Sequence, residues 1–217
     1  MMSMNRLSCS CILGLSLGMS EAAPGAEYTV GAKATTNLPT VLLIGDSISM
    51  AYTPVVQAAL RGVADVSHPP ENCTHTAYGL KQIKTWLGTN KWAVIHFNFG
   101  IHDTGTEGIT PEVYRENLTQ LVGILEGTGA RLIWANSTPL TASWGKRSAG
   151  VIELNQIATK IMVAHKIPIV ELYELVMPNV KDWQTGDGCH LTKQGTEEAG
   201  KQVAEAIRQA LSKSKPK

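Results

Sequence analysis

Residues 40–47 read Thr-Val-Leu-Leu-Ile-Gly-Asp-Ser, an aliphatic run that ends in a glycine and two polar residues. A short apolar run without polar alternation is typical of a strand that is buried on both faces, as in a parallel sheet. Similar runs follow at 93–99, 130–135 and 167–170, with a weaker one at 63–67. The sequence therefore predicts five short strands.

Helical patterns lie between these runs, at 52–61, 80–87, 111–126, 149–166 and 193–211. Thr110 and Thr192 are the expected caps of the third and the last helix, and Pro111 suits a first helical position. Strands that alternate with helices through short connections predict one doubly wound α/β domain over residues 38–212, with a mostly parallel five-stranded sheet. Ligands of such domains bind beyond the carboxyl ends of the strands.

Composition narrows the class of protein. The chain has 217 residues, of which 43% are hydrophobic and 17% charged, and its formal net charge is +1. This length suits one domain with a sizeable core. Because so small a net charge cannot gather phosphate backbones, we expect no nucleic-acid partner, and we expect a monomer.

The N-terminus resembles a secretory signal peptide. Arg6 precedes a nearly uncharged stretch over 7–19, and small residues follow it. We expect cleavage after Ala22, Ala23 or Ala26, so that residues 1–26 are removed. The apolar run is too short to cross a bilayer of about 30 Å, so we expect no integral membrane segment after cleavage. The protein is thus expected to be secreted or periplasmic, and its last five residues, 213–217, form a basic solvated tail.

Cleavage would leave two cysteines, Cys73 and Cys189. Disulfides persist in secreted proteins, so a Cys73–Cys189 bridge is one expectation and two separate buried thiols are the other. We favour the bridge, which would tie a loop after the second strand to the loop that precedes the last helix.

Two segments indicate nucleophilic catalysis. Ser47 follows the first strand at the start of a helix, where a hydroxyl is exposed and an amide is free; the alternative is that Asp46 or Ser47 only caps that helix. Asp187 stands three residues before His190. A carboxylate at this spacing can accept from Nδ1 and leave Nε2 to take a proton from a serine, although either residue alone would be read as part of a turn.

Two further segments supply candidate oxyanion donors. The strand at 93–99 leads into Gly-Ile-His102-Asp103, and a neutral His102 ring can donate one hydrogen bond unless it only satisfies its own loop. The polar segment 71–79 precedes a helix, where the Gly79 amide or the Asn72 side chain could donate to an oxyanion.

Taken in order, these blocks resemble the SGNH or GDSL hydrolases: Gly45-Asp46-Ser47, then Gly79, then Gly100-Ile101-His102-Asp103, then Asp187 with His190. The resemblance covers nearly all of the mature chain and implies the flavodoxin-like fold of that family. His102 stands where the family usually has asparagine, a feature shared with a secreted bacterial subgroup that carries Gly-x-His-Asp. Related secreted members are esterases that act on O-acetyl groups of carbohydrates.

The resemblance implies a serine esterase. Ser47 would be the nucleophile, His190 the base and Asp187 its partner, with Ser47, Gly79 and His102 around the oxyanion. The substrate would be a small-molecule or glycan ester, and no cofactor is implied. A metal site is not expected either, because the histidines are scattered and no His-Glu-x-x-His or Cys-x-x-Cys motif occurs.

Two other functions fit the same residues: a non-catalytic carbohydrate-binding or scaffold protein on a hydrolase fold, and a lipase or thioesterase acting on longer acyl chains. The residues considered for substrate contact are Asp46, Asn72, Asp103, Asn136, Trp144 and Trp183. Arg147 could receive an acidic sugar or pair on the surface.

Overall fold

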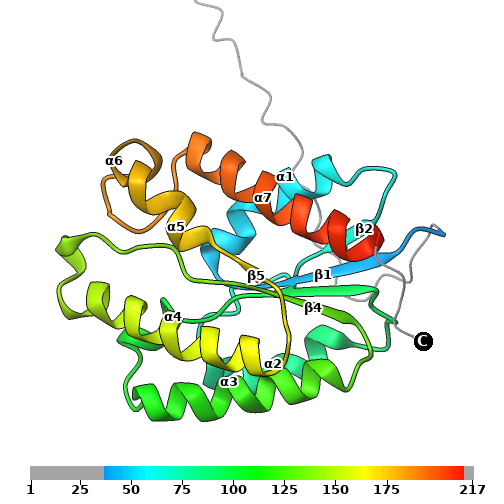
Figure 1. Ribbon diagram of the computed structural model, residues 1–217, viewed down its shortest axis with the longest axis horizontal. Coiled ribbons are helices and arrows are strands. Elements are labelled where there is room, and N and C mark those ends of the chain that lie inside the picture. Colours follow the sequence, from blue (N-terminus) through cyan, green and yellow to red (C-terminus); the bar gives the residue numbers. More distant parts are fainter. Residues whose placement is uncertain (1–36, 213–217) are drawn as a thin grey trace, which may run out of the picture.

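Five strands pair into one parallel sheet in the order β2-β1-β3-β4-β5. The strands are β1 (Thr40–Ile44), β2 (Asp65–Ser67), β3 (Val94–Phe97), β4 (Arg131–Ala135) and β5 (Ile169–Val170). In the computed structural model they run from right to left in Figure 1, so the loops at the left follow their carboxyl ends. The structure describes residues 37–212, and the expected signal peptide (1–26) and basic tail (213–217) lie outside this range.

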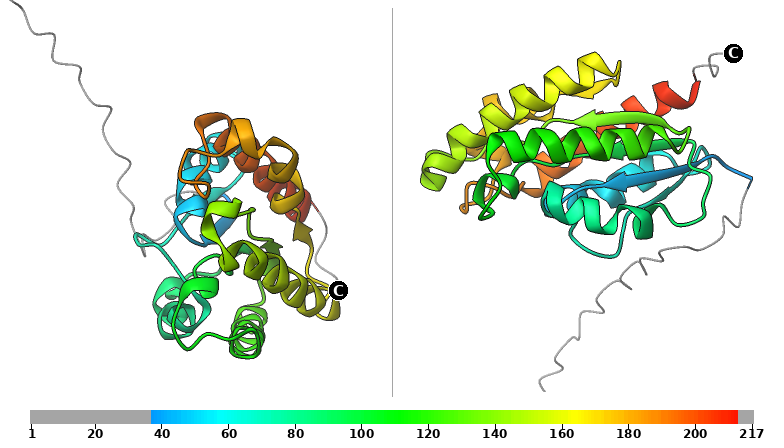
Figure 2. Two further views of the ribbon diagram at one scale, coloured as in Figure 1. Left: turned by 90° about the vertical axis from the view of Figure 1, so that its left-hand side faces the viewer. Right: turned by 90° about the horizontal axis from the view of Figure 1, so that it is seen from below.

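Helices cover both faces of the sheet (Figure 1). Helices α1 (Ser47–Ala59) and α7 (Lys193–Ser212) lie on one face, and α2 (Thr76–Leu87), α3 (Pro111–Glu126) and α4 (Lys146–Ala164) lie on the other. The left view of Figure 2 shows these layers end-on. The predicted doubly wound α/β domain is therefore confirmed.

Strand β1 shows why an unbroken apolar run is needed. Val41 and Leu43 pack into the core under α1 and α7, whereas Leu42 and Ile44 pack into the core over α2, α3 and α4. All four side chains are buried. Because successive side chains point to opposite faces, a strand between two helical layers must be apolar at every position.

Three helices begin earlier than the sequence pattern indicated, and one of them, expected at 149–166, begins at Lys146. The helix expected at 52–61 begins at Ser47, because Asp46 Oδ1 accepts the Ile48 N–H at 3.0 Å and caps it. The helix expected at 80–87 begins at Thr76 and is capped by the ring of His75. The expected caps Thr110 and Thr192 are confirmed, with Thr192 Oγ1 accepting the Gly195 N–H at 3.3 Å.

The connection after β5 holds elements that no pattern predicted. These are α5 (Leu172–Val176), η3 (Met177–Asn179) and α6 (Val180–Trp183); two further short turns of 3₁₀ helix are η1 (Asp103–Gly105) and η2 (Ala142–Trp144). Such short pieces are too brief to show helical periodicity.

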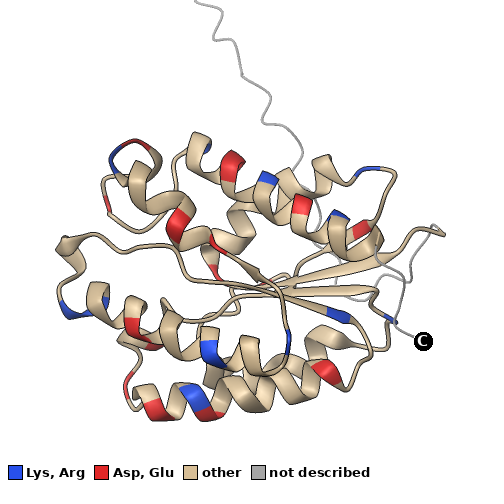
Figure 3. Cartoon of the chain, viewed as in Figure 1, with Lys and Arg blue, Asp and Glu red and all other residues tan. Residues whose placement is uncertain are grey.

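Acidic and basic residues are interspersed over the helices and do not collect in one segment (Figure 3). None of the helices within residues 37–212 is both long and apolar enough to cross a membrane.

Candidate active site

Ser47 is the first residue of α1, directly after the carboxyl end of β1. Because β1 lies between β2 and β3, the loops after those two strands flank the serine on either side. The first N–H groups of a helix have no partner within the helix, and Ile48 already donates to Asp46. The Ser47 amide is therefore placed to donate to an anion at the helix N-terminus.

Ser47, His190 and Asp187 form a chain of hydrogen bonds. Ser47 Oγ lies 2.9 Å from His190 Nε2, and His190 Nδ1 lies 2.6 Å from Asp187 Oδ2. An ionised carboxylate only accepts, so Nδ1 carries the ring hydrogen and Nε2 is free to accept from the serine. The structure thus brings together the three residues that the sequence singled out.

The carboxylate of Asp187 is held in its ionised form. The bond from His190, with others from the Cys189 N–H, the Thr185 hydroxyl and the His190 N–H, keeps the pKa of Asp187 well below its ordinary value. Thr185 was not among the predicted site residues, although a hydroxyl two residues before an aspartate commonly makes a local side-chain contact. The side chains of His190 and Asp187 are 49% and 46% exposed, so the pair is open to a ligand.

The loop after β2 is bound to the nucleophile turn. The Cys73 N–H donates to the Gly45 carbonyl at 3.1 Å, which places Asn72 beside that turn. Asn72 Oδ1 accepts the Thr74 N–H at 2.9 Å, so the remaining hydrogen-bonding group of this side chain is its NH₂ donor.

The prediction that the Gly79 amide faces the oxyanion is wrong. Gly79 lies inside α2, and its N–H donates to the His75 carbonyl at 2.9 Å. A glycine is needed there for packing, because a Cβ would lie 2.9 Å from the ring of Phe99 and 3.3 Å from Leu121.

His75 lies at the edge of the site and was not among the predicted site residues. Its Nδ1 accepts the Tyr78 N–H at 3.2 Å, so in the neutral ring Nε2 carries the hydrogen. Burial, and to a smaller extent the charges on His102 and Lys81, lower the pKa of His75. Histidine is an uncommon helix cap, so no residue type in this segment signals the cap.

Asp103, considered for substrate contact, has a structural role instead. Its side chain is 1% exposed, and Oδ1 accepts both the N–H and the hydroxyl of Thr76, at 2.9 Å and 2.5 Å. Burial raises the pKa of Asp103 to about 6. Asp103 therefore ties the loop that carries His102, a half-buried residue, to the first turn of α2.

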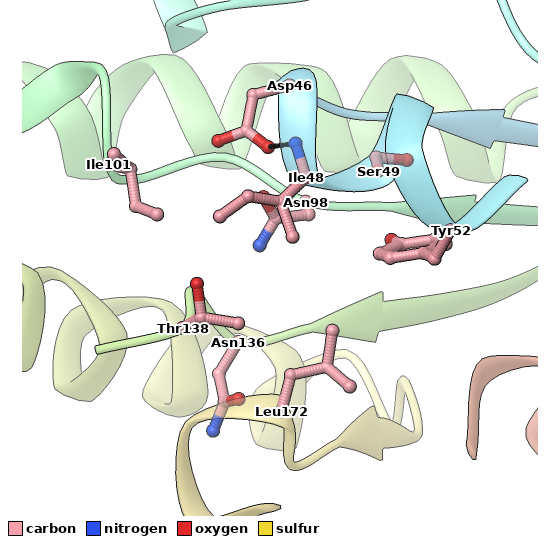
Figure 4. Close-up of a pocket in the computed structure, with 9 residues that line it drawn as sticks. All are labelled: Asp46, Ile48, Ser49, Tyr52, Asn98, Ile101, Asn136, Thr138 and Leu172. Carbon is pink, nitrogen blue, oxygen red and sulfur yellow. Dashed lines mark hydrogen bonds between the residues drawn. The ribbon is translucent and has the colours of Figure 1, made fainter. Parts of the chain in front are cut away.

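Asp46 and Asn136 are likewise buried rather than presented to a substrate. Figure 4 shows them across a small cavity from each other, with Asn98 between them and Thr138 beside Asn136. The cavity measures about 10 Å³, no more than one water molecule occupies. Asn136 Nδ2 donates to Glu171 and Glu174 at 2.7 Å each, so this amide joins the end of β4 to α5.

The two tryptophans considered for substrate contact lie in short helical turns, not in irregular loops. Trp183 ends α6, and a Cβ at Gly195 would lie 2.9 Å from the Trp183 Cβ, so the residue packs against the start of α7. Trp144 is half-buried and donates its ring N–H to the Asp187 carbonyl at 2.7 Å.

The expected disulfide is not formed: Cys73 and Cys189 are free, buried thiols. The reason is their place in the fold, since Cys73 belongs to the core over α2, α3 and α4, and Cys189 to the core under α1 and α7. Burial raises the pKa of Cys73 to about 12 and that of Cys189 to about 11.

Within residues 37–212, no group of three or more His, Cys, Asp or Glu side chains is arranged to hold a metal ion. The site described above is built from a hydroxyl, imidazoles, a carboxylate and amides, the groups that acid–base and nucleophilic chemistry uses.

Comparison by sequence finds no matching family model and no matching curated protein. Solved structures do match. A lipase/acylhydrolase from Enterococcus faecalis has a TM-score of 0.72 and 20% identity, covering 82% of this chain and 100% of that one. A catalytic mutant of an acetylxylan esterase from Geobacillus stearothermophilus has a TM-score of 0.64 and 12% identity, covering 81% and 95%.

A GDSL-like lipase from Bacteroides thetaiotaomicron also matches, with a TM-score of 0.62, 16% identity, and coverage of 79% of this chain and 88% of that one. At such identities the likeness concerns the fold. The chain has the fold of the SGNH hydrolases, as the resemblance implied.

Proposed function

We propose that this chain is an SGNH/GDSL hydrolase and acts as a serine esterase that removes small acyl groups, chiefly O-acetyl groups of carbohydrates. One observation carries the proposal. Ser47, His190 and Asp187 form a chain of hydrogen bonds at the N-terminus of α1. This position is at the carboxyl edge of the parallel sheet, in a chain with the SGNH hydrolase fold.

The geometry supports acyl transfer in two steps. Ser47 Oγ attacks the ester carbonyl carbon while His190 Nε2 takes the hydroxyl proton, and His190 then gives that proton to the leaving alcohol. Water, deprotonated by His190, attacks the acyl-serine, and the carboxylic acid leaves with Ser47 restored. Asp187 stays ionised throughout and stabilises the charged imidazole.

The oxyanion would be held from three sides. The Ser47 amide is free at the helix N-terminus, and the Asn72 NH₂ group takes the place first assigned to Gly79. His102 stands on the loop after β3, on the opposite side of the turn, and can donate from a neutral ring. Each such donor contributes about 2.7–4 kcal/mol at the transition state.

The residues around the triad favour a polar substrate. Asn72, Thr74 and His75 on one side, and Thr185 on the other, are at least partly exposed and offer hydrogen-bonding groups instead of alkyl chains. Similar structures include acetylxylan esterases as well as lipases, so the fold is compatible with either acyl length. Together with the signal-like N-terminus, this supports a secreted or periplasmic enzyme acting on acetylated glycans.

The test is hydrolysis of an activated acetate ester by purified protein, compared with Ser47→Ala and His190→Ala. We expect each variant to lose at least about 10³-fold in kcat while circular dichroism shows it folded. The matched control is His165→Ala, which breaks another His–carboxylate pair, 2.9 Å from Glu126, outside the site. Folded Ser47 and His190 variants with wild-type rates would overturn the proposal.

Acyl specificity is tested with the same leaving group on acetate, butyrate and octanoate, followed by acetic acid release from acetylated xylan. We expect kcat/KM to fall with chain length. A rate that rises towards octanoate would instead assign a lipase-like activity.

A further inference from the structure

We propose that Trp144 and Arg147 are positioning residues that hold the loop of Asp187 and His190 at a fixed place relative to the loop of His102. We call this pair the Trp144–Arg147 strap. The inference rests on the proposed function for its effect on rate, but its structural half can be tested without any activity.

The first end of the strap binds the loop that carries the base. Trp144 Nε1–H donates to the Asp187 carbonyl at 2.7 Å, and the Thr141 N–H donates to the next carbonyl, that of Gly188, at 3.0 Å. Gly188 has a left-handed φ of 69°, and a Cβ there would collide with Thr141. The segment around η2 is therefore fitted closely to this loop.

The middle of the strap is a stacked pair. The guanidinium carbon of Arg147 lies 4.7 Å from the centroid of the Trp144 ring, a cation–π distance. Arg147 forms no ion pair with any residue in 37–212. Its orientation is thus set by the ring and by neutral acceptors.

The second end binds the loop after β3. Arg147 Nη2 donates to the Ile101 carbonyl at 2.8 Å, and Nε donates to Thr104 Oγ1 at 3.1 Å, so the two bonds bracket His102 in the sequence. A Cβ at Gly105 would lie 2.6 Å from the guanidinium carbon. The guanidinium group therefore packs against the Gly105 backbone, and any larger residue at that position would displace it. A planar fork with several donors can pack in this way, and a lysine cannot.

The strap supplies what the triad loop lacks. Within that loop the Asp187 carboxylate is already fixed by the Thr185 hydroxyl and the backbone of Cys189 and His190, so the Asp187–His190 pair is internally rigid. Those bonds do not set where the loop as a whole sits. The Thr141–Gly188 bond and the Gln184 side chain, which donates to the Pro139 carbonyl at 2.6 Å, hold one edge of the loop. The strap adds the link between the base side of the site and the side proposed for the oxyanion.

The experiment compares Trp144→Phe and Arg147→Lys with matched controls from outside the site. Trp92→Phe removes the same kind of bond, from an indole N–H to the Leu87 carbonyl at 2.9 Å, and Arg208→Lys removes a bond to the Ala59 carbonyl at 2.9 Å. We expect the strap variants to lose about 10-fold in kcat, with KM within twofold of wild type, and the controls to stay within twofold in both.

Two features separate positioning from a merely structural role. The pH–rate midpoint should not move, because the Asp187–His190 pair is intact, and the double strap variant should lose no more than the worse single variant, since the two residues act in series. A rise in KM with kcat unchanged would make Trp144 or Arg147 a substrate contact and overturn the proposal.

Amide hydrogen exchange over residues 184–191 tests the structural half independently. Faster exchange in both strap variants and not in Trp92→Phe or Arg208→Lys supports the strap, even if wild type hydrolyses no ester. Unchanged exchange overturns it. Faster exchange with wild-type kcat in an active enzyme would overturn the positioning role alone.

Discussion

At the scale of the residue, Asp187 shows how one carboxylate carries two tasks. Its Oδ1 accepts three bonds from its own loop, and its Oδ2 accepts the single bond that orients His190. The first oxygen fixes where the carboxylate lies, which leaves the second free to fix the ring. With its pKa held low, this division operates over the whole range in which a serine esterase works.

His96 is a buried titratable group outside the site, and it predicts acid sensitivity. It is fully buried in β3, and neither ring nitrogen has a partner among the described residues. Burial and the charge of His68 lower the pKa of His96 to about 3. In the unfolded chain a histidine has a pKa of about 6.5. Below that pH the unfolded state binds a proton at His96 and the folded state does not, so the stability of the fold decreases as pH falls.

We therefore expect His96→Leu to gain about 3 kcal/mol relative to wild type between pH 7.5 and pH 4.5. The measurement is urea unfolding of both proteins at the two values of pH. Asp103, with its pKa raised to about 6, makes stability rise as pH falls. Because both proteins keep Asp103, its contribution cancels in the difference between them. The exposed His165 supplies the control for the loss of a histidine. A difference between His96→Leu and wild type that stays constant with pH would contradict the prediction.

At the scale of the element, the place of Gly79 within α2 predicts a role in packing and not in catalysis. Gly79→Ala should cost about 1–2 kcal/mol of stability, because overpacking against Phe99 outweighs the gain in helix propensity. It should leave kcat within twofold, since the Gly79 N–H is already bonded to His75.

The control for Gly79 is Gly123→Ala in α3, where a Cβ meets nothing within 4 Å. This variant should gain about 0.5–1 kcal/mol. Urea unfolding and ester hydrolysis measured on both variants decide the matter. A large fall in kcat in stable Gly79→Ala would show that the packing of α2 against Phe99 also sets the geometry of the site, and would contradict a role in stability alone.

The elements also show what sequence could and could not predict. The strands and the start of α3 were predictable because each depends on residue types within a short segment. Examples are the apolar run at 40–44 and the pair Thr110-Pro111. The start of α2 was not predictable, since it depends on a histidine cap. For α1 the apolar pattern begins only at 52, although Asp46 and Ser47 already suited a helix start. The place of Ser47 after a strand, the spacing of Asp187 and His190, and the order of the blocks together found the three residues. None of these shows that Gly79 lies within a helix and not in a loop.

At the scale of the whole molecule, the sheet divides the interior into two cores that do not mix. Loops from both cores meet at its carboxyl edge, so residues close to the site can belong to opposite faces. Cys73 and Cys189 are the example: each precedes or follows a site segment, yet they are buried in different cores. The disulfide was expected from the compartment and from the loop positions of the two cysteines. Neither of these indicates in which core a cysteine is buried.

This separation predicts two free thiols in the chain that begins after residue 26, which keeps Cys73 and Cys189. Purified without reductant and unfolded in guanidinium chloride, it should react with two equivalents of a thiol reagent, and the folded protein should react over 100-fold more slowly than a free cysteine at pH 8. Both thiols are buried, and their raised pKa values leave little thiolate. Cys73→Ala should reduce the count to one. A count of zero in the unreduced chain, rising to two after reduction, would restore the disulfide and would require Cys73 and Cys189 to lie together and not in separate cores.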